Sequence, residues 1–598
     1  MDKINIYELA ERYHQLFPKE DMLAIKSKGT MRKYSSEECI NTSNMIAYGL
    51  LNLGIRKNDK ICIISHNRPE WSLVDMGINK IGAINAPIYP NITREEYKYI
   101  ISDCGAKMIF IGSSEIYNQI KDLENEIECL KYIFCFDEME NVKHWSSLVQ
   151  DGTINNQNKL MLDIQKTISK NDLFTLIYTS GTTGKPKGVM LSHNNLLSQV
   201  KVLENLIDIG INDRAISFLP LCHVFERVVE YFYLYKGVSI YYAQSIETLG
   251  EDLKEIKPTI MPTVPRLLEK VYDKIIAKGS SLRGLKKALF FWAVRLGLRH
   301  EYGGKNGILY ELQLAIANKI IFNKWREAVG GRIRYIFSGA SALQERIAKI
   351  FTAAKMPILE GYGLSETSPV ISVNLAHTKN ACYGTVGPVI EGVELKLQHE
   401  EGMKEGEGEI TIKGPNIMLG YYNKPEETKK VIDKEGWFHT GDIGRLIEGK
   451  YLKITDRKKE IFKTSGGKYI APQVMENKFK ESRLIEQIIV IGEGEKHASA
   501  LIVPSEDSMK IWCSRHRIGF SSLKDIITNQ KVLDKFQREI DNYNKLFNHY
   551  EQIKQFRLLS TNWTVDGGEL TATMKLRRKN IINKYQSIYN DIYPKSTI

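Results

Sequence analysis

The sequence predicts an α/β protein with more than one domain. Its first half alternates short β-rich runs with helical stretches, at the spacing expected for parallel strands joined by helices. From about Gly384 short strands separated by glycine-rich turns take over, and a mixed region of strands and helices follows from about Asp456. The length of 598 residues also exceeds one typical domain of about 100–200 residues.

Five consecutive segments establish the alternation in the first half. Residues 60–64 (KICII) are expected to form a strand and residues 70–80 a helix. A second strand is expected at 82–87, a second helix at 94–102, and a third strand at 107–111. Strand–helix–strand order of this kind predicts a parallel sheet covered by helices.

The later part of the chain predicts a second kind of sheet and a domain boundary. Residues 393–397 (VELKL) and 409–413 (EITIK) flank a Gly/Glu-rich turn, which indicates a meander of short antiparallel strands. The mixed region that starts near Asp456 runs to a basic tail. We therefore expect one domain over residues 1–456 and another over residues 457–598.

Composition excludes several classes of protein. Hydrophobic residues make up 43% and charged residues 26%, which is a globular balance and not that of a disordered chain. No apolar run reaches the roughly 18 residues that span a bilayer, and the N-terminus lacks a signal-peptide pattern, so a cytoplasmic protein is expected. The eight cysteines include no CxxC pair, which argues against a zinc or redox site of that type. The net charge of +12 alone fits nucleic acid, a membrane surface or a polyanionic substrate equally well.

One segment departs from the alternation. Residues 265–331 are expected to be mostly helical, and within residues 266–305 ten Lys/Arg stand against three Asp/Glu. Inside it, residues 285–296 (LKKALFFWAVRL) are apolar and aromatic with flanking basic residues, the composition of an interfacial helix. Two interpretations are open: a helix packed against its own domain with a solvated basic face, which we favour, and a peripheral membrane contact.

A run of hydroxyls, glycines and lysines gives the first chemical signal. After a predicted strand at 173–178 the chain reads Thr179-Ser180-Gly181-Thr182-Thr183-Gly184-Lys185-Pro186-Lys187-Gly188. Glycines let backbone N–H groups approach an anion, while hydroxyls add donors and lysines add positive charge, so the run predicts a polyphosphate cradle. It is not a Walker A loop, because Thr179 occupies the position of the first glycine and Pro186 follows Lys185. A P-loop kinase or ATPase is therefore disfavoured.

The run resembles the phosphate loop of the AMP-forming acid ligases, the adenylate-forming superfamily that includes the acyl-CoA synthetases. Further motifs follow in that family's order across nearly the whole chain: Ser338-Gly339-Ala340-Ser341, Gly361-Tyr362-Gly363-Leu364-Ser365-Glu366-Thr367, Trp437-Phe438-His439-Thr440-Gly441-Asp442, Asp456-Arg457-Lys458-Lys459 and Gly568-Glu569-Leu570-Thr571-Ala572-Thr573-Met574-Lys575-Leu576-Arg577-Arg578. The resemblance implies a large N-terminal region of two helix-flanked sheets plus a small β-barrel, followed by a smaller mobile α+β domain.

The resemblance assigns the phosphates and the metal to two of these motifs. It implies that residues 179–184 and Lys187 bind the ATP phosphates. Glu366 and Thr179 would ligate Mg²⁺, and the carboxylate of Glu366 supplies a hard oxygen that suits this ion.

The rest of the nucleotide is assigned in the same way. Tyr362, with Gly361 before it and the Gly339-Ala340 backbone, would hold adenine, because a tyrosine in a glycine-bracketed turn can present its ring for stacking. Either Ser365 or Thr367 would contact the α-phosphate.

The resemblance gives the C-terminal motifs roles in both the nucleotide site and catalysis. Asp442 would accept hydrogen bonds from the ribose hydroxyls, and Arg457 would reach back from the interdomain linker onto the nucleotide. Lys459 would be the pivot of the mobile domain, and Gly466-Gly467 would line the tunnel for the pantetheine arm of CoA. Lys575 would stabilise charge on the transferring carboxylate and the α-phosphate oxygens.

The substrate class is inferred from three further segments. Residues 218–227 (FLPLCHVFER), the helical segment after Pro265 and residues 548–554 (NHYEQIK) resemble the long-chain fatty acyl-CoA synthetase branch. His223 lies within the first of these, and two interpretations stay open for it: a position near the substrate carboxylate, or a satisfied core histidine.

We therefore predict a long-chain fatty acid–CoA ligase, with fatty acid, ATP and CoA as substrates, Mg²⁺ as cofactor and no nucleic-acid partner. The predicted location is cytoplasmic, with peripheral contact at the inner membrane face through residues 285–296 as an option. Two alternatives remain: an acyl-ACP synthetase that uses a carrier-protein thiol, and a catalytically silent AMP-binding sensor. The intact Lys575, Glu366 and Asp442 argue against the sensor.

Overall fold

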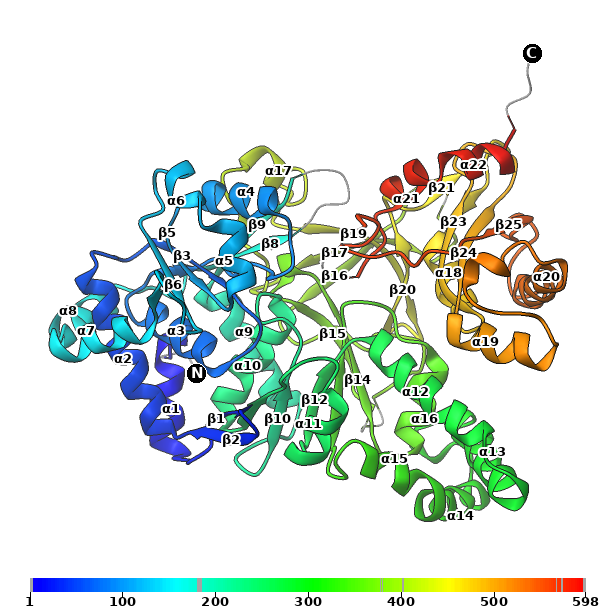
Figure 1. The fold of residues 1–598 in the computed structure, drawn as a ribbon, viewed down its shortest axis with the longest axis horizontal. Coiled ribbons are helices and arrows are strands. Elements are labelled where there is room, and N and C mark those ends of the chain that lie inside the picture. Colours follow the sequence, from blue (N-terminus) through cyan, green and yellow to red (C-terminus); the bar gives the residue numbers. More distant parts are fainter. Residues whose placement is uncertain are drawn as a thin grey trace. The chain divides into compact units, whose positions relative to one another are not determined.

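The computed structural model describes residues 4–179, 185–376, 378, 380–400, 403–565, 567–571 and 574–594 (Figure 1). The chain divides into two compact units. Unit 1 comprises residues 1–395 and 412–438, and unit 2 comprises residues 396–411 and 439–598.

The first of two eight-stranded sheets in unit 1 carries the strand before the glycine-rich run. From β8 to β7 its neighbouring strands are parallel, whereas β8 with β9 and β9 with β18 are antiparallel. The strand order is β18 (Gly420–Tyr421), β9 (Lys187–Ser192), β8 (Leu173–Thr179), β4 (Ile84–Asn85), β3 (Lys60–Ile64), β5 (Ala106–Ile111), β6 (Tyr132–Cys135) and β7 (Lys143–His144). The strands predicted at 60–64, 82–87, 107–111 and 173–178 are confirmed, the second in shortened form.

The second sheet of unit 1 has the same plan. Its inner strands are parallel, and the antiparallel strands β15 and β2 lie at its edges. The strand order is β15 (Val370–Asn374), β14 (Ile358–Gly363), β13 (Tyr335–Ser338), β12 (Ile260–Thr263), β10 (Arg214–Ser217), β11 (Ser239–Tyr242), β1 (Leu23–Ser27) and β2 (Thr30–Tyr34). The inner strands β11 and β13 are buried along their length, as expected for a sheet covered on both faces.

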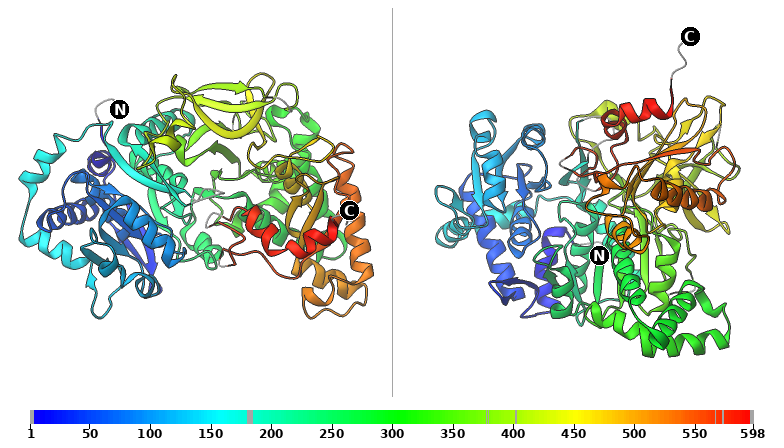
Figure 2. Two further views of the ribbon diagram at one scale, coloured as in Figure 1. Left: turned by 90° about the horizontal axis from the view of Figure 1, so that it is seen from above. Right: turned by 45° about the vertical axis from the view of Figure 1, so that its right-hand side comes forward.

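Helices flank both sheets, so the predicted α/β class with two helix-flanked sheets is confirmed (Figures 1 and 2). The helix predicted at 94–102 is α4, which begins after a Thr93–Glu96 capping box and ends at Gly105 with a positive φ. In unit 1, the helices outside residues 265–331 are α1 (Leu9–Leu16), α2 (Ser36–Asn52), α3 (Pro69–Lys80), α4 (Arg94–Cys104), α5 (Ser114–Ile120), α6 (Leu123–Glu126), α7 (Ser146–Ile154), α8 (Asn158–Gln165), α9 (His193–Leu206), α10 (Val224–Lys236), α11 (Leu249–Ile256), α16 (Glu345–Ala353) and α17 (Pro425–Lys429).

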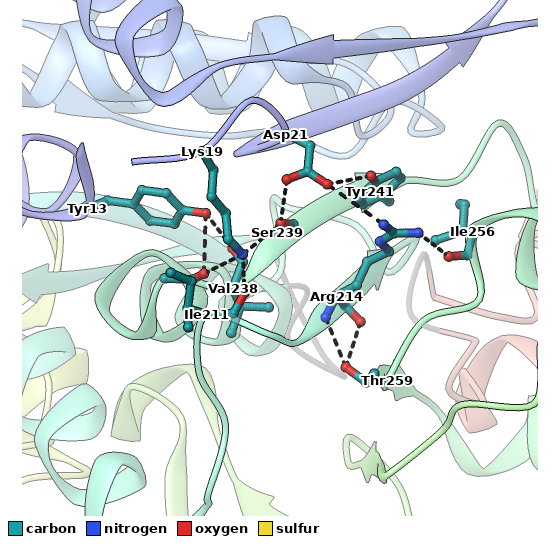
Figure 3. Close-up of polar contacts among 11 residues, drawn as sticks. Tyr13, Lys19, Asp21, Ile211, Arg214, Val238, Ser239, Tyr241, Ile256 and Thr259 are labelled. Carbon is teal, nitrogen blue, oxygen red and sulfur yellow. Dashed lines mark hydrogen bonds and ion pairs between the residues drawn. The ribbon is translucent and has the colours of Figure 1, made fainter. Parts of the chain in front are cut away.

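A polar cluster ties the N-terminal segment to the second sheet (Figure 3). The ammonium of Lys19 donates to the Ser239 hydroxyl at 3.0 Å, and the Tyr241 hydroxyl donates to the Asp21 carboxylate at 2.7 Å. Arg214 lies 3.8 Å from the same carboxylate. Burial lowers the pKa of Lys19, although Asp21 opposes the shift. The cluster joins residues from before β1 to β10 and β11, and we assign it a structural role.

The basic segment, residues 265–331, is mostly helical, as predicted. It contains α12 (Pro265–Ser280), α13 (Gly284–Leu298), α14 (Ile308–Ala317), the π-helical turn η3 (Asn318–Phe322) and α15 (Asn323–Ala328). From Phe290 onward α13 packs into the core of unit 1, whereas its first turn, with Leu285, is exposed. The packing interpretation of residues 285–296 therefore describes the part of α13 from Phe290 onward. None of the helices in the described part of the chain is long and apolar enough to cross a membrane.

The predicted small barrel is instead a four-stranded sheet. Its order is β16 (Glu394–Gln398), β17 (Gly408–Lys413), β19 (Phe438–Ile447) and β20 (Tyr451–Arg457), and no pairing between described residues joins β16 to β20. Small barrels close with about five to eight strands, so four strands are too few. The predicted strands at 393–397 and 409–413 are confirmed as β16 and β17.

The rest of unit 2 has its own hydrophobic core, built from residues between Phe462 and Tyr593. Two strand groups contribute: β21 (Phe462–Lys463) with β22 (Tyr469–Ile470), and β23 (Ile485–Ile491), β24 (Ser499–Pro504) and β25 (Gln555–Leu558). The helices are α18 (Pro472–Phe479), α19 (Glu506–Arg515), α20 (Gln530–Asn544), α21 (Arg578–Lys584) and α22 (Gln586–Ile592). This mixture of strands and helices confirms the expected α+β character.

Candidate active site

The strand pair β8–β9 holds both ends of the glycine-rich run. β8 ends at Thr179 and β9 begins at Lys187, and these two residues are partners in the antiparallel ladder. The phosphate-binding residues predicted at 180–184 lie outside the described part of the chain. The side chains of Thr179 and Lys187 are therefore presented together, where the run leaves and re-enters the sheet.

Lys187 contacts two residues from a much later part of the chain. Its ammonium forms an ion pair with Glu427 at 2.6 Å and lies 5.0 Å from the centre of the Tyr421 ring. Tyr421 belongs to β18, which pairs with β9. The hydrogen bond from Lys187 is the main reason why the pKa of Glu427 falls to about 2. The cation is thus held over an aromatic ring at the end of the run.

Glu366 contacts the hydroxyl of the same tyrosine. The Tyr421 hydroxyl donates to Glu366 Oε1 at 2.9 Å, and the Met418 amide donates to the Glu366 carbonyl at 2.9 Å. Burial, with a contribution from the Glu366 carboxylate, raises the pKa of Tyr421 well above its ordinary value. Tyr421 therefore connects the predicted metal-binding carboxylate to the residue that ends the phosphate run.

This arrangement fits the manner in which proteins bind Mg²⁺. Mg²⁺ is usually held by one or two carboxylates together with substrate phosphates, and not by a cage made only of protein side chains. Among the residues that the structure describes, no three or more His, Cys, Asp or Glu side chains are placed to hold a metal ion. Glu366 would supply the carboxylate and Thr179 a hydroxyl.

The predicted adenine-binding residues lie next to one another at the ends of β13 and β14. These strands are parallel, with Ser338 paired to Glu360, so Gly339 and Gly361 follow at the same edge. A Cβ on Gly339 would lie 3.3 Å from the Gly361 carbonyl oxygen, and Ala340 has a φ of +69°. Tyr362 follows at a register shift between β14 and β15. The structure thus brings Gly339, Ala340, Gly361 and Tyr362 together, and their role in binding adenine stays a prediction.

Ser365 and Thr367 occupy the short helix η4 (Ser365–Thr367), and the structure distinguishes between them. Thr367 is fully buried, and its hydroxyl accepts from the Leu364 amide at 2.9 Å and donates to the Pro369 carbonyl. Ser365 is partly exposed. The Thr367 hydroxyl is therefore occupied in closing the turn, which favours Ser365 as the α-phosphate contact.

Replacing Glu360 with glutamine should make the stability of the chain less dependent on pH. Burial raises the pKa of Glu360 to about 8 from its ordinary 4.5, with one opposing hydrogen bond from the Leu343 amide. Between these values the folded chain keeps a proton that the unfolded chain loses. Stability should therefore fall by about 1 kcal/mol per pH unit as pH rises from about 4.5 to 8.

Glu360→Gln removes this contribution because the amide does not ionise. The free energy of unfolding, measured in urea at several pH values across that window, should decline less steeply for the variant. Parallel curves for the two proteins would contradict a neutral Glu360.

His223 lies at the start of α10 as its N-cap. Its Nδ1 accepts a hydrogen bond from the Phe225 amide at 3.2 Å, and the ring is half-buried. The preceding loop is held by Asn67, whose side chain donates to the Leu219 carbonyl at 2.6 Å and accepts from the Leu221 amide at 3.0 Å. His223 is therefore a capping residue with part of its ring accessible. Proximity to a substrate carboxylate stays a prediction.

A buried charged network under the site is absent from the sequence-based predictions. The Arg227 guanidinium pairs with the Asp75 carboxylate at 2.5 Å and donates to the Thr175 hydroxyl at 2.6 Å, and the Tyr231 hydroxyl also donates to Asp75. Arg227 and Asp75 are almost completely buried. Thr175 lies on β8, four residues before Thr179, so the network supports the strand that leads into the glycine-rich run. Two adjacent charged residues inside the 218–227 motif, Glu226 and Arg227, were the sequence signal that could have pointed to this network.

In unit 2, Asp442 and Arg457 contact each other. They are ladder partners on β19 and β20, and Arg457 Nε donates to Asp442 Oδ1 at 3.0 Å. Asp442 is buried and Arg457 half-buried. The predicted ribose acceptor therefore lies beside the arginine predicted to touch the nucleotide, and both roles stay predictions.

Three other predicted positions in unit 2 lie on turns. Lys459 is exposed in the turn after β20, and Gly466-Gly467 form the turn between β21 and β22, where Gly467 has a φ of +75°. Lys575 is exposed; its amide donates to the Thr571 hydroxyl at 3.1 Å and its carbonyl accepts from the Thr571 amide at 2.9 Å. These two hydrogen bonds hold the backbone of Lys575.

Two family models match the chain, one for each part. The model for AMP-binding enzymes matches residues 14–422, and the model for the C-terminal domain of AMP-binding enzymes matches residues 459–597. The chain belongs to the AMP-binding enzyme family. The predicted resemblance to the adenylate-forming superfamily is thereby confirmed.

Curated relatives match this AMP-binding enzyme over most of its length. Long-chain-fatty-acid–CoA ligase FadD15 of Mycobacterium tuberculosis is 30% identical over 95% of this chain and 93% of the relative. Human long-chain-fatty-acid–CoA ligase 1 is 32% identical over 94% of this chain and 82% of the relative. Long chain acyl-CoA synthetase 3 of Arabidopsis thaliana is 32% identical over 94% of this chain and 87% of the relative.

Solved structures show the same fold for this AMP-binding enzyme. The adenylation domain of a carboxylate reductase from Mycobacterium chelonae aligns with a TM-score of 0.78 at 20% identity, covering 100% of this chain and 92% of that one. ATP-bound MatB from Rhodopseudomonas palustris aligns with a TM-score of 0.71 at 19% identity, covering 98% of this chain and 100% of that one. At these identities the likeness establishes the fold alone.

Proposed function

We propose that this AMP-binding enzyme is a long-chain fatty acid–CoA ligase. The observation that carries the proposal is the match, at 30–32% identity and over at least 94% of this chain, to relatives named for that activity. The geometry around Glu366, Tyr421 and Lys187 supports it, because it places a carboxylate and a cation at the end of a predicted polyphosphate cradle.

The proposed reaction has two steps. An oxygen of the fatty acid carboxylate attacks the α-phosphorus of ATP and pyrophosphate leaves, which gives an acyl-adenylate. The CoA thiol then attacks the acyl carbonyl carbon, loses its proton, and AMP leaves with the bonding electrons. Neither step needs a covalent enzyme intermediate, so positioning and charge stabilisation by this chain's own residues account for catalysis.

We propose the residue roles as follows. Residues 179–184 and Lys187 bind the phosphates, with Ser365 at the α-phosphate, and the Glu366 carboxylate and Thr179 hydroxyl hold Mg²⁺, which would neutralise phosphate charge. Tyr362, with the backbone of Gly339, Ala340 and Gly361, binds adenine. In unit 2, Asp442 binds the ribose, Arg457 touches the nucleotide, Lys459 is the pivot, Gly466-Gly467 contact CoA and Lys575 stabilises the transferring charge.

We also propose a domain boundary after residue 456. The support is that, among the described residues, those that build the C-terminal core all lie between Phe462 and Tyr593. We further propose a cytoplasmic location, with reversible contact at the inner membrane face to which the exposed first turn of α13, with Leu285, would contribute.

The test is consumption of CoA that depends on ATP and Mg²⁺, measured with fatty acids from short to long while AMP and pyrophosphate are quantified. Turnover that increases with chain length supports the proposal. AMP formation only when a holo carrier protein replaces CoA would assign the chain to the acyl-ACP synthetases. The absence of pyrophosphate release with any acid would make it a silent AMP-binding protein.

Asp442→Ala should weaken ATP binding. Two hydrogen bonds from ribose hydroxyls to a carboxylate should be lost, and each is worth about 1.5–3 kcal/mol, so we expect the KM for ATP to rise at least tenfold. The KM for CoA should change little, and this contrast separates nucleotide binding from general damage. A variant with an unchanged KM for ATP would remove Asp442 from the site.

A further inference from the structure

The side chain of Asn67 holds the loop that follows β10. Its amide nitrogen donates to the Ser217 hydroxyl at 2.9 Å and to the Leu219 carbonyl at 2.6 Å, and its amide oxygen accepts from the Leu221 amide at 3.0 Å. Asn67 itself lies in the loop after β3, 150 residues before Ser217. A single side chain from a distant segment therefore fixes the path of the backbone through the first half of residues 218–223.

Asn67 connects two sheet edges that carry different parts of the predicted nucleotide site. In the first sheet β3, β4 and β8 are parallel, so the end of β3 lies at the same edge as Thr179. In the second sheet β10, β12 and β13 are parallel, so Ser217 lies at the same edge as Gly339. Ligands of parallel sheets bind outside the carboxyl ends of the strands. The loop that Asn67 holds therefore lies at the edge where a ligand is expected.

The far end of the loop is fixed by the first turn of α10. The Ser217 hydroxyl, which accepts from Asn67, donates to Glu226 Oε1 at 2.6 Å, and Glu226 is buried. In the same turn the ring of Phe225 would lie 3.8 Å from a Cβ on Gly339. Residues 218–223 are thus anchored at both ends, directly beside the predicted adenine-binding backbone.

We propose that Asn67 is a positioning residue for the carboxylate of the fatty acid. It would act through the loop at residues 218–223, which ends at His223, without touching the substrate itself. The first step requires a carboxylate oxygen close to the α-phosphorus and in line with the leaving pyrophosphate, so a displaced loop would weaken binding of the acid in the reactive position. The inference rests on the proposed function and adds a residue that lies outside all the motifs assigned to it.

The test compares the KM values of the full-length wild type and Asn67→Ala for each substrate. We expect the KM for the fatty acid to rise about tenfold or more, whereas the KM values for ATP and CoA should change by less than about twofold. A merely structural role would lower the fraction of folded enzyme, and therefore kcat, without changing any KM. Asn67 is only half-buried, so the variant should fold, and its thermal melting curve checks this.

A second variant, Asn67→Asp, keeps the size of the side chain and its acceptor for the Leu221 amide. It loses both donated hydrogen bonds, so it should also raise the KM for the fatty acid. Hydrogen exchange provides a readout that does not depend on activity, because peptides that cover residues 218–223 should exchange faster in Asn67→Ala than in the wild type.

The matched control is Asn306→Ala. The Asn306 side chain makes the same pair of contacts on a peripheral loop of unit 1: it donates to the Arg299 carbonyl at 2.9 Å and accepts from the Glu301 amide at 2.7 Å. Its loss should leave every KM, and exchange at residues 218–223, as in the wild type.

Two failures can be told apart. Wild-type protein without turnover on any fatty acid would contradict the proposed function and this inference with it. Normal wild-type turnover combined with an unchanged KM for the fatty acid in Asn67→Ala would overturn this inference alone, as would a rise of similar size in Asn306→Ala.

Discussion

Lys575→Ala should reduce acyl-adenylate formation by about 10²–10³-fold, the usual cost of removing one group that stabilises transition-state charge. The backbone of this lysine forms two hydrogen bonds with Thr571, so shortening its side chain leaves those contacts in place. Thioester formation from chemically supplied acyl-adenylate and CoA should remain close to the wild-type rate. Pyrophosphate release measures the first step, and CoA consumption from acyl-adenylate measures the second.

The matched control is Lys579→Ala, which removes an exposed lysine of the following helix α21. It should leave both half-reactions unchanged. Equal loss of both half-reactions in Lys575→Ala would show that the residue supports folding or domain movement, and its assignment to the first step would be wrong.

Asp75→Ala should cost about 3–5 kcal/mol in the free energy of unfolding, because it leaves the buried Arg227 guanidinium without its carboxylate partner. Arg227 is only 1% exposed, so water cannot replace the lost interaction. Urea denaturation of the wild type and the variant measures the difference. The double variant Asp75→Leu/Arg227→Met should recover much of the loss, because it removes both charges together.

The control for this prediction is Glu426→Ala. That change breaks an ion pair with Lys429 in which both side chains are more than two-thirds exposed, and it should cost less than about 1 kcal/mol. If Asp75→Ala costs no more than Glu426→Ala, the buried pair does not stabilise unit 1.

Local sequence patterns predicted the strands and helices well, because these elements depend largely on neighbouring residues. The strand predicted at residues 60–64 became β3, and the helix predicted at 94–102 became α4. The prediction of a small barrel was wrong. The number of strands in a barrel and its closure depend on pairing between distant segments, and the pattern of short strands in the sequence does not reveal that pairing.

The same distinction explains which parts of the site were missed. Glu366 and Lys187 stand in recognisable motifs, but Tyr421, which contacts both, lies 55 residues after Glu366 and carries no local signature. Asp75 is likewise 152 residues from Arg227, inside an otherwise ordinary helix. Partners of this kind become visible only once the sheets bring distant segments together.

The path of the chain between the two units limits where a hinge can form. It passes from one unit to the other after residues 395, 411 and 438, and all three passages run through or directly adjoin β16, β17 and β19. Bending at those points would require three backbone segments to twist together against the hydrogen bonds of one sheet. After Arg457 a single segment leads into the C-terminal core, so the proposed pivot at Lys459 lies where only one stretch of backbone would have to turn.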